Sequence, residues 1–440
     1  MKNLFLIAFL ILILCCISCA KSKKESIISK NTANKELLSE LLELNNKKNY
    51  FKLQTEFQNR KDELSQVHTL FFDAILNNVF NNPTASNDAI NKIINNNTNS
   101  LEDSLLRKLY FKKMNNHERL FEYDEVAKTV SEIRSKFKTN LDSIEDAGLE
   151  NYYNLYNPLK SIPKQELIIT SDVTILMERD KADLLNIDTF FATQKTNMIF
   201  DTAANISVIR KSYVDKLGMR LIESNFSVGS TTEINVKSEL ALAEEFKIGD
   251  ITIKNAIFMV LEDENLSFPH VPGGYEIYGI IGYPIIKAMR EIHITKDNHL
   301  FIPKSPTEYN LNNLAMDGLN PIIKTIYKDD ILPFQLDTGA QMTLLYQPFY
   351  EKYQLQIEAN NEKSKFGTGG AGGVSVYEGY LVDNIELKIS GTKAVLNELR
   401  LHIEKIDEGD VELYGNLGQD YISQFNKMIL SFEHSSIVFQ

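Results

Sequence analysis

The stretch FQLDTGAQMTLL, residues Phe334–Leu345, sets an aspartate between two apolar segments and follows it with Thr-Gly-Ala. A close copy, IFDTAANISVI, lies upstream at Ile199–Ile209. One Asp-Thr-Gly sequence is common turn chemistry. Two copies in matching surroundings predict instead that two strands deliver two carboxylates into neighbouring turns. An acid–base pair that activates water requires such an arrangement.

The surroundings of the two aspartates are repeated as well. Gly282 in GIIGYPII follows Asp201 at the same spacing as Gly418 in GNLGQDYI follows Asp337 (282 − 201 = 418 − 337 = 81). Two similar stretches lie between these positions, FSVGSTTEINV at 226–236 and FGTGGAGGVSV at 366–376. A duplicated unit shows itself in one sequence as this kind of self-similarity, so we expect two homologous lobes.

The repeated pattern resembles the retropepsin-like aspartic proteases, which have Asp-Thr-Gly-Ala after two apolar residues, a glycine-rich flap, and an apolar-apolar-Gly sequence before a short helix. The resemblance covers about residues 166–440 and places both lobes in one chain, as in pepsins. It implies a bilobal all-β fold with lobes at 166–303 and 321–440. It also implies a peptide or protein substrate in the cleft between the lobes, and chemistry that needs no metal and no cofactor.

On this resemblance Asp201 and Asp337 are the catalytic residues. Two pairs of residues would support them: Thr202 and Thr338, whose hydroxyls would bond to the backbone of the opposite lobe, and Ala203 and Gly339, whose N–H groups would bond to the carboxylates. The same resemblance predicts flaps at glycine-rich hairpins, although such a hairpin can also be only a mobile turn. The flap glycines are Gly229 in the first lobe and Gly367, Gly369, Gly370, Gly372 and Gly373 in the second.

Two positions depart from the family pattern. Ala203 replaces a glycine and adds a Cβ where the lobes approach most closely. Asn416 replaces an apolar residue, and we expect it to loosen the packing under Asp337. These departures leave a second hypothesis open, a catalytically silent lipoprotein that keeps the bilobal cleft and binds a peptide or partner. The two intact Asp-Thr pairs favour the enzyme.

The composition excludes several other classes of protein. The chain has 47 Lys+Arg and 59 Asp+Glu, a formal net charge of −12, which argues against a nucleic-acid partner. Its three cysteines are Cys15, Cys16 and Cys19, so the remainder has neither disulfides nor a thiolate metal site. The sequence also lacks HExxH, Gly-x-Ser-x-Gly and phosphate-loop motifs.

The N-terminal residues have the pattern of a targeting segment. Residues 1–19 combine Lys2, the apolar run Leu4–Leu14 and the sequence CISC, which resembles a bacterial lipobox with Cys19 as the lipidated residue. We expect 20–33 to be a tether and the protein to be membrane-bound through its lipid in the bacterial cell envelope, on the periplasmic or surface face. An ordinary cleaved signal peptide is the alternative.

Residues 34–160 are expected to be helical and repeat-like. Leucines at three- and four-residue spacing predict amphipathic helices, and glycine is absent before Gly148. Such a domain either packs on the protease lobes or forms a solenoid that binds a protein partner. The expected fold class is therefore α+β multidomain, an all-α domain followed by a bilobal all-β protease fold.

Overall fold

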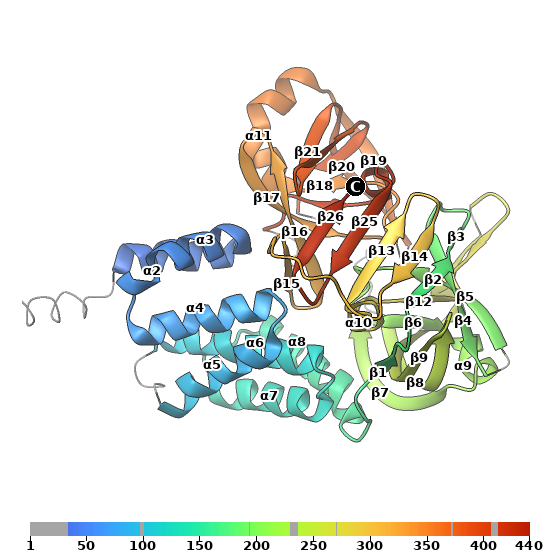
Figure 1. The fold of residues 1–440 in the computed structure, drawn as a ribbon, viewed down its shortest axis with the longest axis horizontal. Coiled ribbons are helices and arrows are strands. Elements are labelled where there is room, and N and C mark those ends of the chain that lie inside the picture. Colours follow the sequence, from blue (N-terminus) through green and yellow to red (C-terminus); the bar gives the residue numbers. More distant parts are fainter. Residues whose placement is uncertain are drawn as a thin grey trace, which may run out of the picture.

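The computed structural model describes residues 34–96, 101–192, 194–228, 236–269, 271–370, 373–405 and 412–440. Helices form the N-terminal part and strands dominate from Glu166 onward, which confirms the α+β multidomain fold class. Figure 1 shows the helices grouped beside two β lobes. The predicted signal peptide, the tether and Cys19 lie outside the described residues. None of the helices described is long and apolar enough to cross a membrane.

The helical part consists of seven described helices, and several of them begin at a side-chain cap. Asn34 accepts a hydrogen bond from the Leu37 backbone N–H, and Asp142 forms a capping box with Glu145. Each helix turns an apolar face inward, as predicted from the leucine spacing. The helices are α2 (Lys35–Asn46), α3 (Tyr50–Arg60), α4 (Gln66–Val79), α5 (Pro83–Asn96), α6 (Asp103–Arg119), α7 (Tyr123–Lys136) and α8 (Ser143–Tyr156).

The first lobe is a nine-stranded sheet in which β12 lies between β5 and β6. β5 pairs in parallel with β12, and β12 pairs antiparallel with β6. The strands of this sheet are β1 (Glu166–Ile168), β3 (Glu178–Arg179), β4 (Leu185–Phe191), β5 (Gln194–Phe200), β6 (Ser207–Arg210), β7 (Arg220–Val228), β8 (Val236–Ile248), β9 (Ile251–Leu261) and β12 (Gly279–Ile281).

The second lobe is a ten-stranded sheet with the same arrangement around its aspartate. β17 pairs in parallel with β24, and β24 pairs antiparallel with β18, as β5, β12 and β6 do. The strands are β15 (Leu314–Asp317), β16 (Asn320–Tyr327), β17 (Asp330–Leu336), β18 (Leu344–Leu345), β19 (Lys363–Gly370), β20 (Gly373–Val382), β21 (Ile385–Ile389), β22 (Thr392–Leu396), β23 (Leu399–His402) and β24 (Gly415–Leu417).

Short helices follow the glycines at the ends of β12 and β24, as predicted. They are α10 (Tyr283–Ala288) and α12 (Gln419–Ile422). Two further helices were not predicted, α9 (Lys211–Lys216) and the longer α11 (Gln347–Asn360), which begins with Gln347-Pro348. Proline at the start of a helix supplies a suitable backbone angle and removes an N–H group that has no partner there.

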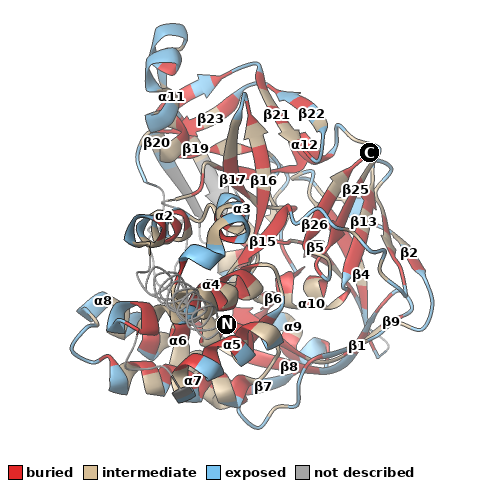
Figure 2. Ribbon diagram, turned by 60° about the vertical axis from the view of Figure 1, so that its left-hand side comes forward, coloured by how far each residue is buried: buried red, intermediate tan, exposed pale blue. Residues whose placement is uncertain are grey.

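A five-stranded sheet joins the lobes. Its order is β2-β14-β13-β25-β26, and β13 from the first lobe pairs antiparallel with β25 from the second over five residue pairs. Its members are β2 (Val173–Leu176), β13 (Glu291–Thr295), β14 (His299–Ile302), β25 (Lys427–Ser431) and β26 (Ser436–Phe439). Figure 2 shows buried residues running along these strands and into both lobes. The lobes are thus held together by backbone pairing as well as by packing.

Candidate active site

Each aspartate lies directly after a central strand of its lobe. β5 ends at Phe200, and the backbone N–H of Asp201 donates to Ile281 O at 3.0 Å. In the second lobe β17 ends at Leu336, and the N–H of Asp337 donates to Leu417 O at 3.0 Å. The parallel pairing of the aspartate strand with the strand before the glycine therefore fixes both Asp backbones in the same way.

Two buried threonines link the aspartate turns across the lobes. The Thr202 hydroxyl donates to Leu336 O at 3.0 Å, and the Thr338 hydroxyl donates to Phe200 O at 2.8 Å. These are the bonds to the opposite lobe that the sequence led us to expect. The backbone N–H of each threonine also donates to the hydroxyl of the other, at 3.0 and 3.1 Å. Both side chains are 0% exposed, so water does not compete for these four bonds.

Backbone N–H groups hold the two carboxyls. The N–H groups of Ala203 and Ala204 donate to Asp201 Oδ1 at 2.8 and 3.1 Å, and the N–H of Gly339 donates to Asp337 Oδ1 at 2.8 Å. The two carboxyls lie side by side and interact directly. Ala203 and Gly339 thus provide the donors predicted for them, and the two lobes bring Asp201 and Asp337 together.

The environment of the pair favours retention of a proton. Burial raises the pKa of Asp201, and the neighbouring charge of Asp337 raises it further. Burial also raises the pKa of Asp337, while donors from Asn416 and Gly339 oppose that shift. As whole residues, both aspartates are half-buried. Two interacting carboxyls of this kind titrate as one unit that binds a single proton over a range of pH.

Asn416, which we expected only to loosen the packing under Asp337, forms a hydrogen bond with that aspartate. Its side chain is 7% exposed, and its amide Nδ2 donates to Asp337 Oδ2 at 2.7 Å. The carboxylate thus satisfies the amide nitrogen of this buried side chain, while the amide oxygen Oδ1 has no hydrogen-bond partner among the described residues. We missed this contact because the family pattern treats the position as an apolar packing residue.

The predicted second-lobe flap is an antiparallel hairpin of β19 and β20. The pairs Gly367↔Val376, Gly369↔Val374 and Gly370↔Gly373 belong to its register. Arg400 Nη1 donates to Gly367 O at 2.6 Å and so braces one strand of the hairpin. Gly229 of the first-lobe flap and Gly372 of the second lie outside the described residues.

The structure adds supporting residues that our sequence analysis missed. The Ser207 hydroxyl accepts from the Gly282 N–H, and the Thr343 hydroxyl accepts from the Gly418 N–H, both at 3.0 Å. Each hydroxyl residue lies six positions after its aspartate (207 − 201 = 343 − 337 = 6), so the internal repeat contained a signal for this pair. Gln419 is a third supporting residue that we did not predict, because its Nε2 donates to Thr338 O at 2.9 Å.

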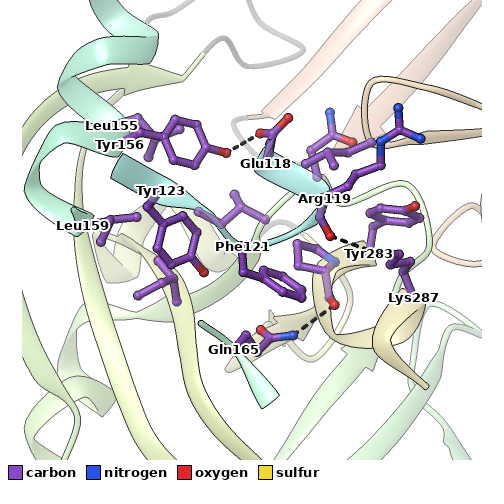
Figure 3. A pocket seen from close by; sticks show the side chains of 15 residues that line it. Glu118, Arg119, Phe121, Tyr123, Leu155, Tyr156, Leu159, Gln165, Tyr283 and Lys287 are labelled. Atoms are coloured by element: carbon purple, nitrogen blue, oxygen red, sulfur yellow. Dashed lines mark hydrogen bonds between the residues drawn. The ribbon is translucent and has the colours of Figure 1, made fainter. Parts of the chain in front are cut away.

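A separate hollow lies where the helical part meets the first lobe and does not include either aspartate. Its volume is about 40 Å³, room for a few water-sized groups. Figure 3 shows Tyr156 donating to Glu118 on one side and Lys287 bonded to the backbone of Arg119 on the other. The described residues contain no group of three or more His, Cys, Asp or Glu side chains that could hold a metal ion.

One comparison with known proteins finds a family match over part of the chain. Residues 189–285 match the family model described as aspartyl protease. No curated protein matches the chain. Among solved structures, the chain is similar to conglutin gamma, a basic 7S globulin from lupine seeds, with 8% identity and a TM-score of 0.37 over 61% of this chain and 94% of that one. It is also similar to a retropepsin-like aspartic protease from Rickettsia conorii, with 18% identity and a TM-score of 0.23 over 30% of this chain and 99% of that one.

The matched segment contains the first aspartate turn, the strands that carry it and the glycine of β12. Over residues 189–285 the chain is thus similar to the aspartyl protease family.

Proposed function

We propose that the chain is an aspartic endopeptidase that hydrolyses peptide bonds with water activated by Asp201 and Asp337. The observation that carries this proposal is the pair of aspartate turns with their carboxyls side by side. The turns are linked by two hydrogen bonds between Thr202 and Thr338 and by one bond from each threonine hydroxyl to the backbone of the opposite lobe. Two carboxyls so placed share one proton, because ionising both would set two negative charges side by side in a partly buried site.

The shared proton gives the two carboxyls complementary tasks. The ionised carboxylate accepts a proton from a water molecule while the protonated carboxyl donates to the oxygen of the substrate carbonyl. Water oxygen bonds to the carbonyl carbon and produces a tetrahedral diol. The diol then breaks its C–N bond as the leaving nitrogen receives the proton taken from water, and the other proton returns to the pair. No covalent enzyme intermediate forms.

The alternative of a silent binding protein depends mainly on Ala203. Its N–H bond to Asp201 Oδ1, at 2.8 Å, equals that of Gly339 to Asp337. The methyl group therefore does not remove the donor that the family glycine provides, which supports the enzyme over the silent protein.

Cleavage of a peptide library by the full chain at acidic pH tests the activity. We expect inhibition by a statine-type hydroxyl compound that mimics the diol, and no effect of chelators or of serine- and thiol-directed reagents. Asp201→Asn and Asp337→Asn should each lower kcat/KM by about 10³-fold or more. Asp383→Asn, outside the pair, is the control. Undiminished cleavage by either dyad variant would reject the pair as the catalyst.

We further propose that the enzyme is attached to the bacterial cell envelope through lipid on Cys19, with either periplasmic or surface exposure. The support is the lipobox-like CISC sequence before a polar segment. Metabolic labelling with a fatty acid should mark the wild type and not Cys19→Ser. Equal labelling of both would exclude lipidation at this residue. A protein partner on the helical domain stays a prediction.

A further inference from the structure

The lobes differ in chemistry at one equivalent position beside the aspartates. Asn416 follows Asp337, and Ile280 follows Asp201, at the same distance (416 − 337 = 280 − 201 = 79). Both occupy the middle of the short strand before the glycine. Each pairs in parallel with the residue two before the aspartate, which is Gln335 for Asn416 and Ile199 for Ile280. At this equivalent position the first lobe has the apolar side chain of Ile280, and the second lobe has the side-chain amide of Asn416.

This difference makes the hydrogen bonding of the two carboxyls unequal. Asp337 accepts at both oxygens, Oδ1 from the Gly339 N–H at 2.8 Å and Oδ2 from the Asn416 amide at 2.7 Å. Asp201 accepts both of its backbone bonds, from Ala203 and Ala204, at Oδ1. A carboxylate that accepts at both oxygens is stabilised in its ionised form, while Oδ2 of Asp201 is left to carry a proton.

We propose that Asn416 is a positioning residue that keeps the negative charge of the pair on Asp337 and the shared proton on Asp201. This inference rests on the proposed function and assigns the two catalytic roles. Asp337 takes the proton from water, and Asp201 donates to the substrate carbonyl oxygen. The neighbouring charge of Asp337 acts in the same sense, because it raises the pKa of Asp201.

Burial strengthens the effect of the Asn416 hydrogen bond on Asp337. Asn416 is 7% exposed between β17 and β18, so bulk water cannot readily replace its N–H donor. Other ionisable groups around this turn are engaged elsewhere. Asp420 accepts from the Thr343 N–H and hydroxyl at 2.9 and 2.6 Å, and Arg179 donates to the Gln419 side chain at 3.2 Å. Among the described residues, the ionisable group bonded to Asp337 is Asp201.

The pH dependence of kcat/KM tests the assignment through Asn416→Leu. Loss of the donor should raise the pKa at which Asp337 ionises, so the acid limb should move to higher pH by about one unit or more. Ile280→Asn offers a matched change in the other lobe, because it supplies a donor to Asp201. Melting temperature identifies any variant that fails to fold. An active Asn416→Leu enzyme with an unmoved acid limb would overturn the inference.

A second measurement does not require turnover. An ionised carboxylate opens an epoxide by forming a C–O ester bond as the ring C–O bond breaks, and the resulting alkoxide takes a proton from water. An aryl epoxide should therefore label Asp337 in the wild type, as read by peptide mass mapping, and should label both aspartates in Asn416→Leu. Preferential labelling of Asp201 in the wild type would overturn the assignment.

The two measurements separate this inference from the proposed function. Full activity of Asp201→Asn would reject the catalytic pair whatever Asn416 does. Loss of activity in both dyad variants, with unchanged pH profile and labelling in Asn416→Leu, would reject only the role of Asn416.

Discussion

A single methyl group distinguishes the two turns that hold the carboxyls, since Ala203 occupies the place that Gly339 has in the other lobe. A Cβ built on Gly339 would lie 2.4 Å from Asp201 Cγ, closer than any real contact permits. Glycine is therefore required on the Asp337 turn because the Asp201 carboxyl lies against its backbone. The Ala203 turn carries a Cβ and still donates its N–H at 2.8 Å.

This asymmetry predicts opposite results for two reciprocal substitutions. Gly339→Ala should displace Asp201 and lower kcat/KM by about 100-fold, a loss expected from a misplacement on the order of 1 Å. Ala203→Gly should keep or raise activity, because it relieves crowding and retains the N–H donor. It should cost about 0.5–1 kcal/mol of stability through added backbone freedom. The measurement is kcat/KM on one peptide for the wild type and both variants, together with their melting temperatures. A large loss in Ala203→Gly at unchanged melting would show that the methyl shapes the site.

The residues of the pair could be predicted because the repeat was present in the sequence. Equal spacings identified Asp201 and Asp337, and the motif indicated which atoms of Thr202 and Thr338 would bond. Asn416 could not be placed in this way, because an unusual residue indicates a departure and not its direction. Only the distance from its amide nitrogen to Asp337 shows that the substitution adds a hydrogen bond.

At the scale of elements, helix α8 is hydrogen-bonded to β7, the strand that precedes the predicted first-lobe flap in the sequence. Asn151 of α8 donates through Nδ2 to Ser227 O and accepts at Oδ1 from the Ser227 N–H, both at 2.7 Å. These two bonds pair a side-chain amide with β7 as a neighbouring strand would. The edge of β7 is therefore held by the helical domain just before residues 229–235.

Asn151→Ala should loosen this strand. The two bonds lost are expected to cost about 1–3 kcal/mol, and the Ser227 amide should exchange its hydrogen faster than in the wild type. Hydrogen exchange measured by mass spectrometry checks the local effect, with Asn154→Ala on the same helix as the control. Protection at Ser227 that is the same in all three proteins would mean that packing alone holds β7.

The elements themselves were predictable to different degrees. The short helices expected after Gly282 and Gly418 are present. The sharing of β13 and β25 in one sheet was not predictable from local pattern. Their pairing joins residues far apart in the chain, and short apolar runs specify a strand without specifying its neighbour.

At the scale of the molecule, the helical domain is packed onto both lobes. One hydrophobic cluster contains leucines of α2 and α6 together with Ile199 and Val208 of the first lobe and Ala315 of the second. Hydrogen bonds join Asn81 to Phe432 O at 2.6 Å and Lys287 to Arg119 O at 3.0 Å. Of the two roles considered for this domain, these contacts favour packing on the protease lobes over a free-standing solenoid.

Asp317 at the end of β15 is the main ionic link between the helices and the second lobe. It pairs with Lys48 at 2.9 Å and Lys112 at 3.8 Å, and it accepts from the Tyr50 hydroxyl at 2.8 Å. Burial opposes its ionisation, but the two lysines and the hydroxyl prevail and lower the pKa of Asp317 to about 2. The folded state therefore holds this proton less tightly than the unfolded chain does.

The sign of that shift fixes how stability should depend on pH. The contribution of Asp317 is complete above the unfolded pKa of about 3.9 and disappears as pH falls through the folded value, so it amounts to about 2 kcal/mol at neutral pH. Asp317→Asn should be less stable than its parent by about that amount at pH 6, and the difference should vanish near pH 2. Urea unfolding in an Asp201→Asn background, which prevents self-cleavage, measures this. Asp329→Asn, an exposed position in the next hairpin, is the control. If the loss of unfolding free energy in Asp317→Asn stayed constant down to pH 2, the contribution of Asp317 would come from packing and not from its charge.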